Sequence, residues 1–184
     1  MVQERRGSAR PEEESGQGMK RIVASRGLAI LIAALVAADW LSKLWITNRL
    51  ALGETRAIVD GWLYFVHRRN PGVAFSMFAD LPVDWRVPLF SALGVVGIIV
   101  FTRILRSTPD RLARLAAALV IAGALGNMGD RLVTGQVTDF VLLAFFPFVF
   151  NVADAAITLG GSMLALRLAA ATEPTPTGSS TASG

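Results

Sequence analysis

Hydrophobic and polar positions divide this chain into long apolar runs separated by polar segments. The runs cover residues 27–46, 87–105, 112–133 and 149–168. A helix of about 20 residues rises far enough to cross the ~30 Å hydrocarbon core of a bilayer. The pattern therefore predicts an all-α membrane protein with four transmembrane helices.

The two ends of the chain have a different composition. Residues 1–19 are polar and rich in Glu, Gly and Ser, and residues 171–184 are of low complexity. Neither end shows an apolar period, so we predict a disordered N-terminal arm and a disordered tail around a membrane domain at 20–170. The first apolar run continues through Trp45 and Ile46, which is too long for the core of a cleaved signal peptide. We therefore expect a retained anchor.

Charge sets the expected orientation and excludes one class of partner. Hydrophobic residues make up 53% of the chain and charged residues 17%, and the formal net charge is +4. Basic residues precede the first run and fill the second connection: Lys20, Arg21, Arg26, Arg103, Arg106, Arg111 and Arg114. This placement follows the positive-inside rule and forms no basic stripe, so it predicts cytoplasmic termini and no nucleic-acid partner.

The two connections expected outside the cytoplasm carry structural signals of their own. In residues 47–86, β-branched and aromatic residues around Asp60-Gly61 predict a small hairpin. Residues 73–81 are apolar enough to form an interfacial helix, and 140–150, broken by Pro147, is expected to enter the outer interface. Both segments could clamp lipid and exclude water, or could only anchor the protein.

Polar residues near the outer ends of the predicted spans indicate a site. They are Asp39, Lys43, Asn127, Asp130, Arg131, Asp139, Asn151 and Asp154. A charged side chain inside a span costs roughly 2.5–3.5 kcal/mol on insertion scales, so it needs a partner or a function. Helix rise places those within the runs in the same outer third of the bilayer, so we predict a single site.

Spacing suggests how these groups pair. Asp39 and Lys43 stand at i,i+4 and are expected to form an ion pair, and Asp130 is expected to pair with Arg131. Asp139 and Asp154 have no cation at helical spacing. Two unpaired carboxylates near a medium of low dielectric constant would share a proton, as in aspartic proteases, although a proton or ion pathway would use them equally well.

The residue inventory removes most other hydrolytic chemistries. The chain has no cysteine and one histidine, His67, which we expect at the surface or the interface. Ser42 and Lys43 are adjacent, so they point about 100° apart on a helix and do not form a dyad. No metal site or cofactor is predicted. If the protein is a protease, the aspartates are its best candidates.

Several motifs, in their order along the chain, resemble the lipoprotein signal peptidase (signal peptidase II) family. They are Asp39-Trp40-Leu41-Ser42-Lys43, Asn70-Pro71-Gly72-Val73-Ala74-Phe75, Gly123-Ala124-Leu125-Gly126-Asn127-Met128-Gly129-Asp130-Arg131, Val137-Thr138-Asp139-Phe140 and Phe150-Asn151-Val152-Ala153-Asp154. The resemblance covers residues 20–168. The long polar N-terminal arm and the short apolar connection between Asp139 and Asn151 depart from the family pattern.

The resemblance implies a bacterial inner-membrane aspartic endopeptidase, active as a monomer, that cuts prolipoproteins before a diacylglyceryl-modified cysteine. It implies Asp139 and Asp154 as the catalytic pair. It implies a substrate-holding role for Asn70, Gly123, Asn127, Arg131 and Asn151, and a supporting polar shell of Asp39, Lys43 and Asp130. An extracytoplasmic β-cradle and amphipathic helix would correspond to residues 50–85, and globomycin-type cyclic peptides would be inhibitors.

Two other classes of function remain open. A four-span proton- or ion-coupled transporter could use Asp39, Lys43, Asp139 and Asp154 as a relay, and it would need polar groups in the cytoplasmic half of the spans. The runs contain essentially none there. A purely structural membrane scaffold would leave Asp139 and Asp154 unexplained.

Overall fold

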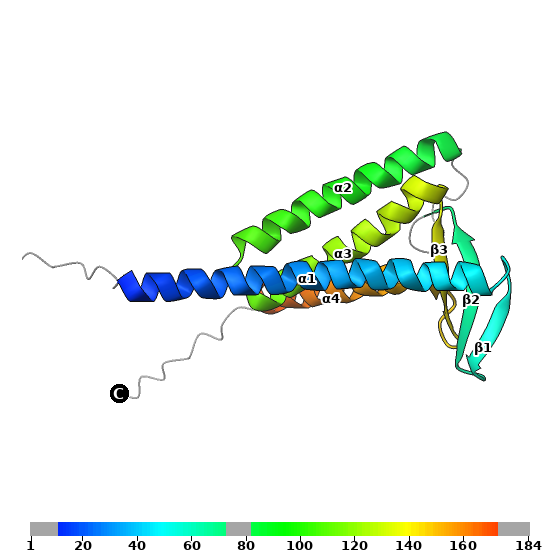
Figure 1. Ribbon diagram of the computed structural model, residues 1–184, viewed down its shortest axis with the longest axis horizontal. Coiled ribbons are helices and arrows are strands. Elements are labelled where there is room, and N and C mark those ends of the chain that lie inside the picture. Colours follow the sequence, from blue (N-terminus) through cyan, green and yellow to red (C-terminus); the bar gives the residue numbers. More distant parts are fainter. Residues whose placement is uncertain (1–10, 73–81, 173–184) are drawn as a thin grey trace, which may run out of the picture.

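A computed structural model describes residues 11–72 and 82–172. Long helices run along one direction, and a small sheet stands at one end of them (Figure 1). The helices are α1 (Pro11–Arg49), α2 (Val83–Ser107), α3 (Arg111–Thr134) and α4 (Val152–Thr172). Within the described ranges, four helices are long and apolar enough to cross a membrane, as the sequence predicted.

Two helix boundaries differ from the prediction. α1 begins at Pro11, so it includes residues 11–19, which the sequence analysis assigned to the N-terminal arm. Proline is favoured at the first helical position, because its fixed φ suits the helix and its missing N–H would have no partner there. α4 begins at Val152 and not at residue 149, because Val149 and Phe150 form a strand.

The sheet is antiparallel, with the strand order β1-β2-β3-β4. Its strands are β1 (Thr55–Val59), β2 (Leu63–Asn70), β3 (Val137–Leu143) and β4 (Val149–Phe150). Gly61, with φ of 74°, lies in the turn between β1 and β2 and adopts the left-handed conformation that favours glycine. The hairpin predicted around Asp60-Gly61 is therefore present.

The second outer connection supplies half of this sheet, which corrects the prediction for residues 140–150. That run was expected to enter the membrane interface, but its first residues continue β3 and its last belong to β4. An apolar, β-branched segment such as Val137–Leu143 satisfies its backbone groups by pairing, here with β2. The interfacial helix predicted at 73–81 lies outside the described residues.

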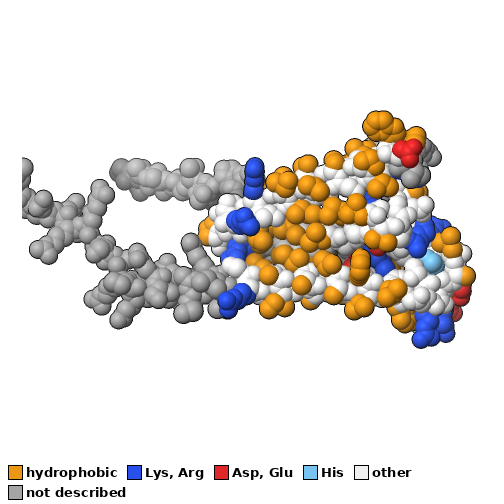
Figure 2. All heavy atoms as spheres, turned by 45° about the horizontal axis from the view of Figure 1, so that its top comes forward, with side chains coloured by type: hydrophobic (Ala, Val, Ile, Leu, Met, Phe, Trp, Pro, Cys, Tyr) orange, Lys and Arg blue, Asp and Glu red, His pale blue; other side chains and the backbone are white. Residues whose placement is uncertain are grey.

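α3 is the central helix of the bundle. It packs against α1, α2 and α4, and 61% of its apolar stretch is buried, against 6% for that of α2. Figure 2 shows hydrophobic side chains along the outer surfaces of the helices, with Lys and Arg side chains near both ends of the bundle. This surface suits helices surrounded by lipid.

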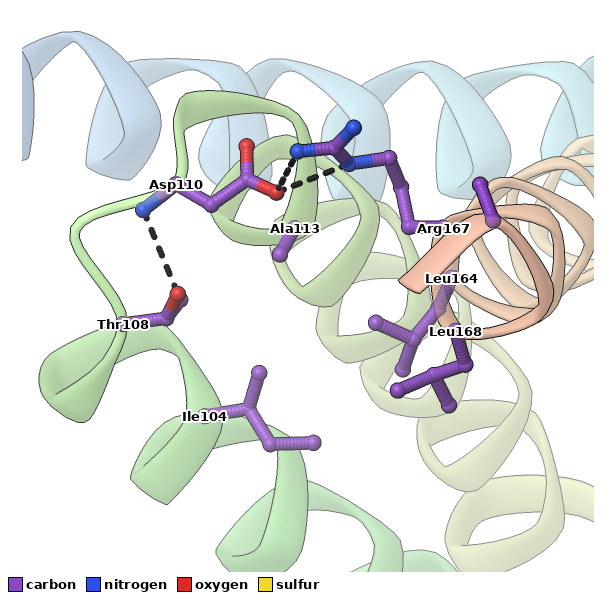
Figure 3. A pocket seen from close by; sticks show the side chains of 8 residues that line it. Ile104, Thr108, Asp110, Ala113, Leu164, Arg167 and Leu168 are labelled. Atoms are coloured by element: carbon purple, nitrogen blue, oxygen red, sulfur yellow. Dashed lines mark hydrogen bonds and ion pairs between the residues drawn. The ribbon is translucent and has the colours of Figure 1, made fainter. Parts of the chain in front are cut away.

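An ion pair joins two helices at the end away from the sheet. The Asp110 carboxylate caps α3 by accepting a hydrogen bond from Leu112 N at 2.9 Å. It also accepts two from Arg167 near the end of α4, at 2.8 and 2.7 Å (Figure 3). The pair is partly exposed, so it adds little stability, and it links the start of α3 to the end of α4.

His67 is buried, which corrects its predicted place at the surface or interface. It lies on β2 with 7% of its surface exposed, and its Nδ1 atom is 2.9 Å from the carbonyl oxygen of Leu50. β2 folds back over the end of α1, and the imidazole meets the backbone there. Its role in the structure is therefore to join the sheet to the bundle.

Close packing of α3 and α4 at Gly160 yields a stability prediction. A Cβ atom at Gly160 would lie 2.5 Å from the Ala116 carbonyl oxygen, whereas one at Gly161 would meet no atom within 4 Å. Gly160→Ala should destabilise the protein by about 1–3 kcal/mol through overpacking. The matched Gly161→Ala variant should lose no stability. Thermal unfolding in detergent micelles measures both, and equal melting temperatures would contradict the packing argument.

Candidate active site

Polar side chains from several elements meet where the helix bundle joins the sheet. They come from α1 (Asp39, Lys43), the end of β2 (Asn70), α3 (Asn127, Asp130, Arg131), β3 (Asp139) and the start of α4 (Asn151, Asp154). Hydrogen bonds and ion pairs connect all of them into one network. The structure thus brings together every site residue suggested by the sequence except Gly123.

Gly123 serves helix packing in this structure. It is buried on α3, where an added Cβ atom would overlap the carbonyl oxygen of Ala153 and the side chain of Ile157 on α4. The small residue therefore lets α3 and α4 approach closely. Its role in holding substrate stays a prediction.

The Lys43 ammonium is the centre of the buried part of the network. Its Nζ atom lies 2.6 Å from Asp39 Oδ2, so the predicted i,i+4 pair is present. The same atom lies 3.1 Å from Asp130 Oδ2 and 3.1 Å from Asn127 Oδ1. The Lys43 side chain is only 4% exposed. One buried cation therefore faces two buried carboxylates and one amide oxygen.

The predicted pairing of Asp130 with Arg131 is wrong. Asp130 pairs with Lys43 and accepts a hydrogen bond from the backbone N–H of Thr138 at 2.9 Å. Consecutive residues on a helix point about 100° apart, so Asp130 turns toward α1 while Arg131 turns toward α2. The Arg131 guanidinium lies over the Phe90 ring and donates to the carbonyl oxygens of Gly72 and Asn127.

Asn151 and Asp154 form a capping box at the start of α4. The side-chain oxygen of Asn151 accepts from Asp154 N at 2.8 Å, and the Asp154 carboxylate accepts from Asn151 N at 3.3 Å. This reciprocal arrangement satisfies backbone donors at a helix N-terminus. Asn151 therefore precedes the helix and is fully buried, whereas the sequence placed it inside the fourth span.

Hydrogen bonds from three asparagines reach all four carboxylate oxygens of Asp139 and Asp154. Asp139 accepts from the side-chain amides of Asn70 at 2.8 Å and Asn151 at 2.7 Å. Asp154 accepts from the side-chain amide of Asn127 at 2.7 Å, and from the Asn151 backbone as described above. Asn151 thus bridges the two carboxylates and holds them next to each other.

The environment of Asp139 favours its protonated form. Burial, followed by the neighbouring Asp154 carboxylate, raises the pKa of Asp139 to about 7. Hydrogen bonds from Asn70 and Asn151, and the positive charge of Lys43, oppose this rise in pKa without cancelling it. A pair of adjacent carboxylates that holds one proton near neutral pH can act as acid and base together.

A largely apolar cavity of about 870 Å³ opens beside the two carboxylates. Polar groups gather at one end of it: Asn70, Asn127, Arg131, Asp139 and Asp154. The other walls are Phe90, Leu93 and Gly94 of α2, aromatic residues of the β3–β4 turn, and one face of α4. Its size and chemistry suit an extended peptide with apolar side chains or acyl chains.

Sequence reasoning did not find the α2 wall of this cavity. Phe90 and Leu93 read there as ordinary members of an apolar run, and no polar neighbour in the sequence distinguishes them. Asp39 has a second contact that spacing does not reveal, because it accepts a hydrogen bond from Ala153 N at 2.9 Å. Within the described ranges, no group of three His, Cys, Asp or Glu side chains is placed to hold a metal ion.

Comparisons with known proteins agree on one family. The family model described as signal peptidase (SPase) II matches residues 31–170. The lipoprotein signal peptidase of Pseudomonas syringae pv. tomato is 39% identical over 143 residues, which is 74% of this chain and 82% of that protein. The lipoprotein signal peptidase of Syntrophotalea carbinolica is 40% identical over 147 residues, covering 76% and 89% respectively.

Solved structures show the same fold. A bacterial membrane enzyme determined by the in meso method aligns with a TM-score of 0.73 and 27% identity, over 80% of this chain and 90% of that one. A second structure with the same description aligns with a TM-score of 0.68 and 27% identity, over 77% and 92%. Both alignments cover most of each chain.

The buried network predicts an asymmetry between its members. Lys43→Met leaves two buried carboxylates without their cation, which should cost about 3–5 kcal/mol of folding free energy. Asp39→Asn should cost less, because Lys43 keeps Asp130 as its partner. Unfolding followed by circular dichroism in detergent compares the variants. Asp39→Asn being as destabilising as Lys43→Met would contradict a central role for Lys43.

Proposed function

The chain belongs to the signal peptidase II family, and we propose that it is a membrane aspartic endopeptidase for prolipoproteins. It removes the signal peptide by cutting before a cysteine that carries a diacylglyceryl group. The single observation that carries this proposal is the pair Asp139 and Asp154, held side by side by asparagine amides at the polar end of an apolar cavity. No cofactor is needed for this chemistry.

The reaction needs one proton shared between the two carboxylates. The ionised carboxylate takes a proton from a water molecule, whose oxygen attacks the scissile carbonyl carbon, while the protonated carboxyl donates to the carbonyl oxygen. A tetrahedral diol results. The first carboxyl then gives its proton to the leaving nitrogen, the C–N bond breaks, and the diol returns a proton to the other carboxylate. The pair is then restored to its starting state.

Other residues hold the reacting groups and the substrate. Asn70, Asn127 and Asn151 orient the carboxylates, since their amides donate to the carboxylate oxygens. Arg131 faces the cavity and is placed to bind a substrate backbone carbonyl, as it binds that of Gly72. The apolar walls accommodate the diacylglyceryl chains, and a globomycin-type cyclic peptide would compete for the same space.

The location of the site fits a substrate anchored in the membrane. The arginines that flank the α2–α3 connection favour a cytoplasmic location for that end of the bundle, with the sheet on the outer face of a bacterial inner membrane. The scissile bond then reaches water at the outer interface while the lipid stays in the bilayer. One chain contains the whole network, so a monomer suffices.

A transporter would require a different distribution of polar groups. Among the described residues, the buried charged side chains that could form a relay gather at the sheet end of the bundle. In the half of the bundle farther from the sheet, the helices face one another with apolar residues. Polar groups that are reached from one side of the membrane only suit hydrolysis. The substitutions below distinguish hydrolysis from transport, because their effect is measured as peptide cleavage.

The decisive test replaces each candidate carboxylate separately. Asp139→Asn and Asp154→Asn should each lower the rate of cleavage of a diacylglyceryl-modified prolipoprotein by about 10²–10⁴-fold, since either change removes one acid–base partner. Asp60→Asn, in the exposed β1–β2 turn, is the matched control and should cleave normally. Cleavage is followed by the mass shift of the substrate. Normal cleavage of the substrate by either folded site variant would contradict the proposal.

The pH profile gives a second test. With the pKa of Asp139 near 7, kcat/KM should fall as the pH rises above about 7, because the pair then loses its shared proton. Asn70→Ala removes a donor that stabilises the ionised form, so it should raise this apparent pKa and move the alkaline limb to higher pH. An alkaline limb that stays in place or moves to lower pH would contradict the assigned role of Asn70.

A further inference from the structure

A second cavity, of about 400 Å³, lies at the end of the bundle farthest from the sheet (Figure 3). The end of α2, the start of α3 and the end of α4 surround it. Ile104, Leu164 and Leu168 point into the space, and the ion pair of Asp110 with Arg167 stands at its rim. The cavity is therefore apolar inside and charged at one edge.

The same three helices line this cavity and the one beside the carboxylates. On α4, a single stripe connects them, formed by Asp154, Ile157, Gly161, Leu164 and Leu168. These positions alternate by three and four residues, so they share one helix face. Asp154 and Ile157 line the cavity beside the carboxylates, the upper cavity. Leu164 and Leu168 line the second cavity, the lower one. Gly161 lies between them, and a side chain there would meet no atom within 4 Å.

α2 and α3 continue the same path. On α2, Phe90 and Gly94 line the upper cavity and Ile104 lines the lower one. Gly97 lies between them at the same heptad spacing, and an added Cβ atom at this glycine would also meet no atom within 4 Å. On α3, Ala113 lines the lower cavity. The same face of α3 lines the upper cavity nearer the end of the helix. Gly97 and Gly161 thus add no side chain to the path between the two cavities.

We propose that the two cavities are the ends of one groove that binds the apolar core of the signal peptide. The lower cavity receives the end of that core farthest from the scissile bond. This inference rests on the proposed function, because the groove begins at the two carboxylates. It adds a distal subsite, formed by Ile104, Ala113, Leu164 and Leu168, to the site at which cleavage takes place.

The length of the groove matches such an occupant. Arg167 follows Asp154 by thirteen positions on α4, a rise of about 20 Å. The apolar core of a secretory signal peptide has about 7–15 residues, which as a helix extend about 10–22 Å. Residues near the scissile bond are extended and cover more distance each. A core of about 13 residues, toward the upper end of this range, therefore reaches from the carboxylates to the rim.

The charged rim then limits the length of the core. Asp110 and Arg167 occupy the place where the apolar segment must end and the polar N-terminal part of the signal peptide begins. A longer core would carry apolar side chains into contact with these charges, whose burial without water is costly. A shorter core would leave the lower cavity unfilled. The distal subsite therefore selects signal peptides by length.

Cross-linking tests this placement, because the chain contains no cysteine. Leu164→Cys puts a thiol in the lower cavity, and Leu166→Cys puts one on the outer face of the same helix, where Leu166 is 71% exposed. The probe is a diacylglyceryl-modified prolipoprotein with one free cysteine moved along its signal peptide, presented to each variant in the Asp139→Asn background. Leu164 follows Asp154 by ten positions, so disulfide formation should peak near the tenth residue before the cleavage site for Leu164→Cys and be at least tenfold lower for Leu166→Cys.

The outcomes separate the groove from the proposed function. Equal cross-linking of the two variants, or cross-linking of Leu164→Cys that does not depend on cysteine position, would mean that only lipid fills the cavity and would overturn the inference. If the wild-type chain cleaves the substrate but no position cross-links to Leu164→Cys, the groove is wrong and the proposed function stands. If cross-linking peaks as expected but the wild-type chain leaves the substrate intact, the groove stands and the proposed function fails.

Kinetics give a second measurement on the intact enzyme. Leu164→Trp fills the lower cavity and should raise KM about tenfold for a substrate with a 13-residue core, because the displaced apolar residues lose their burial. It should leave a substrate with an 8-residue core unaffected, and Leu166→Trp should affect neither substrate. Equal effects of Leu164→Trp on both core lengths would contradict selection by length.

Discussion

The ammonium group of Lys43 fixes the position of the two candidate carboxylates through three partners. Asp39 uses its other oxygen to accept the N–H of a residue in the first turn of α4. Asp130 faces Lys43 with Oδ2, and the same oxygen accepts the N–H of the residue that precedes the β3 aspartate. Asn127 accepts from Lys43 and donates to the α4 aspartate, so the cation also sets which way this amide points. A helix start, a strand and an amide thus depend on one buried charge.

The side-chain hydrogen bonds to the candidate carboxylate pair come from asparagines and not from cations. An arginine on Asp139 would lower its pKa and keep both carboxylates ionised, whereas an amide orients the oxygens without adding a full charge. The network separates these tasks. Lys43 forms ion pairs with Asp39 and Asp130, and Arg131 donates hydrogen bonds to backbone carbonyl oxygens. The hydrogen-bond donors to the pair are therefore neutral, so they orient the carboxylates without adding a full charge.

Local features of the sequence predicted more of this molecule than did features that depend on distant pairing. The four apolar runs and the Asp60-Gly61 turn are visible within short windows, and both are present. Whether Asp130 pairs with Lys43 or with Arg131 depends on the position of α1 in the bundle, and a short stretch of sequence around Asp130 carries no information on that position. β3 was missed because an apolar run at a membrane surface has the same composition whether it pairs with a strand or enters the interface.

Helix packing and electrostatics are not separable in this bundle. A Cβ atom at Gly126 would lie 2.6 Å from Asp39 Oδ2 and 3.2 Å from the side chain of Ala153. The missing side chain is therefore what lets α1, α3 and α4 approach until Asp39 reaches the backbone of α4 and Lys43 reaches Asp130. In lipid, apolar contacts between helices bring little net gain, so close backbone approach and satisfied polar groups must hold the bundle together. The residues that make the helices fit are thus the same ones that bring the carboxylates within reach of their donors.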